Sequence, residues 1–355
     1  MSIRSTTVKI LSLNGGGARG LFTINVLAEI ERIIEMRTGR SDVKAGDYFD
    51  LITGTSIGGI LALGLAAGKS ARELESVFRA HAPLIFPPNN FFKKKWRTAF
   101  GAQYRSQPLR DAVISMVGAH TTFDDLGRRV MIPAVNLSTG KPHFFKTPHN
   151  PLFTRDGRLT LVDAAMATSA APTYFPPHHC EALDSYFADG GLVANNPSLV
   201  ALYEALQDMT SDFDVTVNDV KILNIGTLGE EYTISPAALE KNRNNGYLGL
   251  WGFGERLVLT TMTANQQLHK SILERELRTV GASDNYVYLD DTVPNEAASD
   301  ITLDNASTSS LRNLASRGKQ LATNEFTKNA QLQAFFEHPT PAFKRKEHVQ
   351  QEQSS

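Results

Sequence analysis

A serine set between two glycines, at residues 54–58, is the feature that most limits how this chain can fold. Residues 49–53 read as a buried strand, and residues 57–67 form an apolar run that predicts a helix. A sharp strand–turn–helix corner holds its serine in a strained, exposed position, and glycines such as Gly54 and Gly58 allow close backbone approach. Ser56 is therefore predicted to be a nucleophile on an α/β sheet.

A glycine-rich loop near the N-terminus supplies a second part of the same chemistry. Residues 8–13 predict a strand and residues 21–37 show helical apolar spacing, so the loop joins a strand to a helix. Such a turn offers free backbone N–H groups and the positive end of a helix dipole, both of which suit a developing oxyanion. The residues predicted to form this oxyanion hole are Gly15, Gly16, Gly17, Ala18, Arg19 and Gly20.

One acid, Asp189, follows a short predicted strand and precedes Gly190 and Gly191. Asp-Gly is a frequent turn pair, so this acid taken alone would be interpreted as a turn residue. In the same chain as a nucleophilic serine and a glycine loop, however, it is a candidate for the base that activates the serine.

Strands and helices alternate through the first two-thirds of the chain. Strands are predicted at 8–13, 49–53, 129–135, 143–145, 186–188 and 220–226, and helices at 21–37, 57–67, 71–80, 109–117, 161–168 and 197–209. This alternation favours an α/β fold, with a mostly parallel sheet and helices on both faces.

The three motifs, taken in order and with their spacing, resemble the oxyanion loop, the nucleophile elbow and the catalytic aspartate of patatin-like phospholipases. The segment 167–177 is also similar to that family, and the similarity covers about the first two-thirds of the chain. The resemblance implies lipid acyl hydrolysis by a Ser–Asp dyad without histidine. Carried over, Ser56 is the nucleophile, Asp189 is the base, and the amides around Gly16, Gly17 and Ala18 hold the oxyanion.

Two alternatives compete with this interpretation. The glycine loop also satisfies the Gly-x-Gly-x-x-Gly pattern of dinucleotide-dependent oxidoreductases, but the second strand ends in Gly54-Thr55-Ser56 rather than in a ribose-binding acid. A Ser-His-Asp hydrolase would take its histidine after the acid, which leaves His269, His338 or His348, none of them in a distinctive loop. The hydrolase with a Ser–Asp dyad is the prediction that uses all three motifs.

Composition and charge exclude several other classes. The formal net charge of −1 gives no support for a nucleic-acid partner. A single cysteine excludes a cysteine zinc cluster, and the neighbouring His178 and His179 have no carboxylate at ligand spacing, so no metal site and no catalytic cofactor are predicted. The N-terminus shows no signal pattern, and the longest apolar run is too short to span a bilayer, which favours a cytoplasmic protein.

Aromatic and basic residues alternate between residues 83 and 105. Rings at head-group depth and cations on phosphate suit a membrane surface, so this segment is interpreted as a peripheral contact with the inner membrane or as a lid. The candidate contact residues are Phe91, Phe92, Lys93, Lys94, Lys95 and Trp96.

The character of the chain changes after residue 226, where a polar loop is followed by a predicted helix at 255–277, a strand at 286–289 and a helix at 309–329. We predict a catalytic domain over 8–226, a mixed α/β C-terminal extension with a regulatory or structural role over 227–338, and a disordered polar tail over 339–355.

The full-length chain also resembles the patatin-like effectors of bacterial CBASS anti-phage systems, through the block at residues 12–22, the compact size and the motif-poor C-terminal third. This resemblance implies a phospholipase that a cyclic dinucleotide switches on, and that degrades the phospholipid of the cell's own membrane. A ligand-gated lid or a homodimer interface would keep such an enzyme off its membrane until needed. The alternative is an ungated lipid acyl hydrolase, such as a lysophospholipase or esterase.

Overall fold

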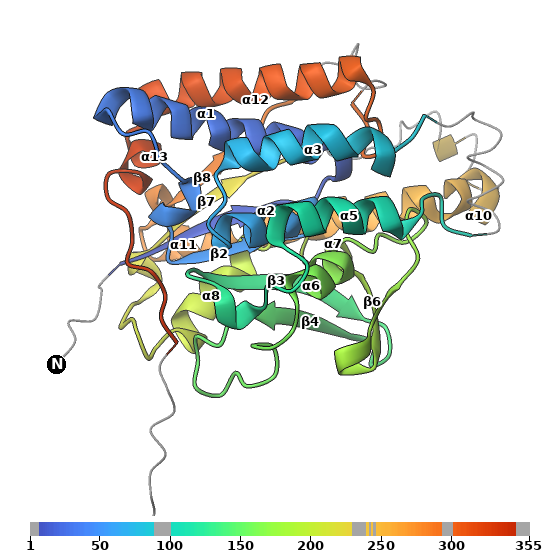
Figure 1. Ribbon diagram of the computed structural model, residues 1–355, viewed down its shortest axis with the longest axis horizontal. Helices are drawn as coiled ribbons and strands as arrows, with labels where there is room; N and C mark the ends of the chain where they lie inside the picture. The colour runs from blue at the N-terminus through green and yellow to red at the C-terminus, as the bar shows by residue number, and fades with distance from the viewer. Residues whose placement is uncertain are drawn as a thin grey trace, which may run out of the picture.

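In the part of the chain that the structure describes, eight strands form one sheet, and helices cover it on both sides (Figure 1). The computed structural model describes residues 7–88, 101–228, 239–240, 243, 246–292 and 301–345. Within these residues, the strands lie across the sheet in the order β5 (His178–Cys180), β6 (Ser185–Asp189), β3 (Arg129–Asn136), β2 (Leu51–Gly54), β1 (Val8–Leu13), β7 (Val220–Ile225) and β8 (Tyr286–Leu289), while β4 (Lys141–Lys146) pairs with β3.

Parallel pairing joins β3, β2, β1, β7 and β8, and β1 lies between β2 and β7. The last residue of β1, Leu13, is opposite both Gly54 and Ile225, so the segments that follow these three strands leave the same edge of the sheet. The strand β6 runs antiparallel to β3, with Asp189 opposite Ala134. The register thus brings the glycine loop, the Ser56 turn and Asp189 to one edge.

The predicted helices are confirmed with small differences at their ends. The α-helices in the described residues are α1 (Gly20–Thr38), α2 (Ile57–Ala66), α3 (Ala71–Ile85), α5 (Ser106–Val117), α6 (Leu161–Thr168), α7 (Gly191–Ala194), α8 (Ser198–Asp208), α10 (Gly246–Gly249), α11 (Glu255–Thr279), α12 (Thr308–Lys328) and α13 (Ala330–Phe335).

Side chains alternate along β1 between the two faces of the sheet. Leu11 and Leu13 join the larger core, which includes buried residues of α1, α2, α3, α5, α6 and α12. Val8 and Ile10 join a second core formed with α8 and α11. The prediction of an α/β sheet with helices on both faces is therefore confirmed, although β4, β5 and β6 make the sheet mixed rather than purely parallel.

The region after residue 226 continues the same structure. Strand β8 extends the sheet by pairing with β7, and α12 packs closely along α1. At Gly318 of α12, a side chain would place its Cβ 2.5 Å from the Phe22 carbonyl oxygen of α1, so glycine permits this close approach. The predicted catalytic domain and C-terminal extension thus share one sheet and contribute to both cores.

Residues 339–345 of the predicted polar tail make contacts with the rest of the described chain. The Thr340 amide donates to the Asp47 carbonyl at 2.8 Å, and the Phe343 amide donates to the Gly127 carbonyl at 2.8 Å. The Phe343 side chain is buried, and the Arg128 guanidinium bonds the Thr340 carbonyl at 2.9 Å. A polar composition concealed these contacts, because most of them use backbone groups that composition does not report. Residues 346–355 lie outside the described residues.

Candidate active site

Ser56 occupies the turn between β2 and α2. Its backbone angles, φ 55° and ψ −125°, lie in a region that residues other than glycine rarely adopt, which is the strain expected of a nucleophile turn. A side chain at Gly54 would place its Cβ 2.1 Å from the Gly58 carbonyl oxygen, and one at Gly58 would lie 2.4 Å from the Leu13 carbonyl oxygen. Both glycines are therefore needed for the turn to close.

The backbone of Ser56 is held from the neighbouring helix α6. The Ser56 amide donates to the Thr168 hydroxyl at 3.0 Å, and that hydroxyl donates in turn to the Pro133 carbonyl at 2.6 Å. Thr168 lies in the segment 167–177 that resembles the family, but the sequence analysis gave this threonine no role of its own. These bonds fix the turn and leave the serine side chain free to face the cavity.

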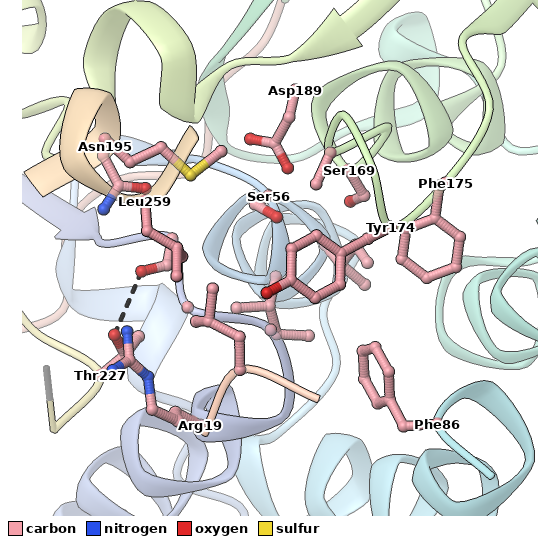
Figure 2. Close-up of a pocket in the computed structure, with 18 of the residues that line it drawn as sticks. Arg19, Ser56, Phe86, Ser169, Tyr174, Phe175, Asp189, Asn195, Thr227 and Leu259 are labelled. Atoms are coloured by element: carbon pink, nitrogen blue, oxygen red, sulfur yellow. Dashed lines mark hydrogen bonds between the residues drawn. The ribbon is translucent and has the colours of Figure 1, made fainter. Parts of the chain in front are cut away.

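Asp189 lies at the end of β6 with its side chain pointing toward the Ser56 hydroxyl (Figure 2). The residue is fully buried, and its Oδ1 accepts a hydrogen bond from the Gly191 amide at 2.7 Å. Its Oδ2 makes no hydrogen bond of normal geometry within the described residues. Burial raises the pKa of Asp189 from 3.8 to about 7, while the Gly191 amide and the nearby Ser56 hydroxyl each lower this pKa in part.

The glycine loop lies beside Ser56. Of the amides predicted to bind the oxyanion, those of Gly16 and Gly17 are unbonded in the described residues and that of Ala18 is not. The Gly15 amide donates to the Asn195 carbonyl at 3.1 Å, and the Ala18 amide donates to the Leu303 carbonyl at 2.7 Å. Within the described residues, no acceptor bonds the amides of Gly16 and Gly17. The Ala18 amide is therefore engaged in this structure, and the two preceding amides are the ones free to meet an oxyanion.

Close packing explains the run of glycines. A Cβ at Gly16 would lie 2.3 Å from the Thr227 Oγ1, and one at Gly17 would lie 2.2 Å from the Leu303 carbonyl oxygen. Gly17 also has a φ of +57°, which favours glycine. At the end of the loop, Gly20 allows α1 to approach Ile57, the first residue of α2.

Arg19 lies behind the loop with a buried guanidinium. Burial lowers its pKa, and the nearby Asp290, Tyr174 and Tyr288 act in the opposite direction. Its Nε has no hydrogen-bond partner within the described residues, although part of the side chain lines the cavity. This placement suits a brace for the glycine loop better than a group that takes part in proton transfer.

Ser56 and Asp189 line a cavity of about 960 Å³, open solvent included. Part of its lining is apolar and comes from α3, α5 and the segment after α6, which suits contact with an acyl chain; these residues are Phe78, Ile85, Phe86, Leu109, Tyr174 and Phe175. The other side is formed by α11 and by Leu303, which the sequence analysis did not place at the site; the α11 residues are Leu259, Met262, Thr263, Gln266 and Gln267.

Amide side chains hold α11 against the site. The Asn265 side chain donates to the Gly191 carbonyl at 2.6 Å and accepts from the Asn195 amide at 3.0 Å, while the Asn195 side chain donates to Gln266 at 2.7 Å. The sequence analysis gave Asn265 and Gln266 no role, because the helix that carries them contains no motif. The C-terminal third therefore contributes directly to the cavity.

The remaining predicted residues are placed as follows. No histidine of the described residues lines the cavity, and the Nδ1 of His269 lies 3.3 Å from the Asn196 carbonyl oxygen instead. In that part of the chain no cluster of three metal-binding side chains occurs, and none of its helices is long and apolar enough to cross a bilayer. The candidate membrane contacts Phe91, Phe92, Lys93, Lys94, Lys95 and Trp96 lie outside the described residues.

A strained serine at the carboxyl end of a parallel strand, beside free amides and an apolar cavity, defines the class of α/β acyl hydrolases. Residues 11–202 match the family model described as patatin-like phospholipase. The chain belongs to the patatin-like phospholipase family, as its motifs predicted, and it is a lipid acyl hydrolase.

Curated relatives cover nearly the whole chain. A "cGAMP-activated phospholipase" of Escherichia coli strain TW11681 is 66% identical over 338 residues, which span 95% of both chains. A protein of the same description from Vibrio cholerae serotype O1 is 65% identical over 344 residues, which span 95% of this chain and 96% of that one. "Patatin-like protein 2" of Arabidopsis thaliana is 30% identical over 348 residues, spanning 88% of this chain and 82% of its own.

Proposed function

We propose that this chain is a phospholipase that uses Ser56 as nucleophile and Asp189 as base, and that a cyclic dinucleotide switches it on. The proposed roles of Ser56 and Asp189 in catalysis are supported above all by the position of the Asp189 carboxyl. Its side chain is fully buried and points toward the Ser56 hydroxyl, its Oδ2 has no hydrogen bond of normal geometry within the described residues, and both residues line the same cavity.

In the proposed reaction, Asp189 takes the proton from the Ser56 hydroxyl as the oxygen attacks the acyl carbonyl. The amides of Gly16 and Gly17 donate hydrogen bonds to the oxyanion that forms. Collapse of the intermediate expels the alcohol, which takes the proton from Asp189. Water then attacks the acyl-enzyme by the same route and releases the fatty acid, which leaves Ser56 and Asp189 as they began.

The shifted pKa of Asp189 makes this mechanism dependent on pH. A base with a pKa of about 7 is protonated below pH 7, so kcat/KM on a soluble ester should rise through about pH 7 and level off above it. A stopped-flow or pH-stat profile measures this midpoint. Glu31 is a matched control, since burial also raises its pKa to about 7 away from the cavity. The Glu31→Gln variant should keep the midpoint, and a wild-type midpoint near pH 4 would contradict the assignment of Asp189.

Activation by a cyclic dinucleotide is supported by the relatives that span 95% of the chain and carry the description "cGAMP-activated". It is also supported by the placement of α11 and Leu303 at the cavity, since a regulatory part that contacts the site can change it. The proposed role is degradation of membrane phospholipid during phage infection, with the enzyme at the inner-membrane surface when active. The segment 83–105, with the candidate contacts at residues 91–96, remains the predicted lid or contact with that surface.

The test is fatty-acid release from vesicles of bacterial phospholipid, with and without cGAMP, by the full-length chain. We expect slow release without the nucleotide and a rise of at least tenfold with it. Equal and rapid release in both arms would leave an ungated lipid acyl hydrolase. Failure to hydrolyse any ester in either arm would contradict the proposed catalytic function itself.

A further inference from the structure

A second cavity lies between α3 and α12. It is a groove between the C-terminal half of α3 and the N-terminal half of α12, and it holds about 1120 Å³ of space, open solvent included. We call it the α3–α12 groove. Its residues are Arg79 and Pro83 of α3, Ala306, and Thr308, Leu311, Arg312, Ala315, Ser316 and Lys319 of or next to α12.

The groove has basic side chains at its rim and an apolar floor. Ala306, Leu311 and Ala315 are buried, and no acidic residue lines the groove. Arg312 and Lys319 are exposed, and neither has a carboxylate within 4.0 Å in the described part of the chain. Arg79 pairs with Glu75 at 2.8 Å but stays 38% exposed. Cations above small apolar residues suit a ligand that carries both phosphates and flat bases.

Both sides of the groove also contribute to the active-site cavity. On one side, Phe78 and Ile85 of α3 line the cavity while Arg79 and Pro83 line the groove. Pro83 has no amide proton, so it cannot donate to the Arg79 carbonyl, and α3 is weakened at this turn. The last turn of α3 can therefore shift more easily than the rest of the helix.

On the other side, residues 301–306 connect the groove to the glycine loop. Ala306 lines the groove, and three residues earlier the Leu303 carbonyl accepts from the Ala18 amide at 2.7 Å. Asp304 between them accepts a hydrogen bond from the Tyr104 hydroxyl at 2.7 Å. A ligand that moves Ala306 relative to α3 would thus act on the glycine loop through a few covalently linked residues.

We propose that the α3–α12 groove is the binding site of the activating cyclic dinucleotide, which rests on the activation proposed above. The two phosphates lie against Arg312 and Lys319, with Arg79 within reach, and a purine base lies over Leu311 and Ala315. Binding draws α12 and the last turn of α3 together and shifts residues 301–306, so that the lipid gains access to Ser56. Only the difference in affinity between the two states of the enzyme drives this change.

The test uses Arg312→Ala, Lys319→Ala and the double variant, with Lys328→Ala as the matched control. Lys328 is an exposed lysine on the same helix that does not line the groove. Calorimetry measures the Kd for cGAMP, and vesicle hydrolysis measures the concentration for half-activation. Loss of one charged contact to phosphate should raise both by about tenfold or more, and the double variant should lose more than either single variant. Hydrolysis of a small soluble ester should match the wild type in all four variants.

The outcomes separate this proposal from the proposed function. Wild-type cGAMP affinity in the double variant would overturn the groove assignment and leave activation intact. A wild-type enzyme that hydrolyses vesicles but neither binds nor responds to cGAMP would overturn activation and the groove together. Equal weakening by Lys328→Ala would show a general effect of charge rather than a site.

Discussion

Ser56→Ala is expected to lower ester hydrolysis by about 10³-fold or more, and Asp189→Asn should have an effect of similar size. The alanine removes the attacking oxygen, and the asparagine cannot take its proton. Because the two groups act as a unit, the double variant should be little worse than either single variant. Release of a chromophore from a soluble ester measures all three effects.

The stability of Asp189→Asn provides an independent check on the same residue. In the folded wild type, burial raises the pKa of Asp189 above its unfolded value of 3.8 to about 7. The folded state therefore binds the proton more tightly, and the wild type loses stability as the pH rises from about 4 to about 7. Urea unfolding should show Asp189→Asn gaining stability relative to the wild type over that interval. Full activity in Asp189→Asn would contradict the dyad, and Ser185→Ala on the same strand β6 serves as the active control.

Gly16→Ala is expected to lower kcat by about 10²–10³-fold, the range typical for the loss of one oxyanion-hole donor. The new Cβ would lie 2.3 Å from the Thr227 Oγ1, so either Thr227 or the loop must move. The Thr227 hydroxyl donates to the Gly15 carbonyl at 3.1 Å, and a shift there would also displace the free amides. The effect should fall on kcat rather than on KM, because the oxyanion forms only during reaction.

Gly127→Ala is the matched control for the glycine loop, because a Cβ at that position has no atom within 4 Å and no positive φ opposes it. Steady-state kinetics and a melting curve should be recorded for both variants. An unchanged kcat in a well-folded Gly16→Ala protein would show that the loop does not hold the oxyanion.

The strands, the helices and the turn at Ser56 could be predicted because each depends on a local pattern. A short run of mostly apolar residues predicts β1, and a glycine–serine–glycine corner predicts the turn at Ser56. The family similarity then supplied the relation between two motifs that lie more than a hundred residues apart in the chain.

The contribution of the C-terminal third could not be predicted in the same way. Leu303 reaches the glycine loop through its backbone carbonyl, which any residue type could provide. The α11 residues that line the cavity have the mixed composition of an ordinary surface helix, and only their position against Asn195 gives them a role. Contacts of this kind depend on the tertiary arrangement rather than on a sequence pattern.

The hydrogen bond between the Ala18 amide and the Leu303 carbonyl has a consequence for how the enzyme is made. Synthesis proceeds from the N-terminus, so residue 18 leaves the ribosome long before residue 303. The glycine loop lacks its partner, and α1 lacks its packing against α12, until almost the whole chain has emerged. A nascent chain would therefore stay without lipase activity during translation, and the cell would meet a competent enzyme only after chain release.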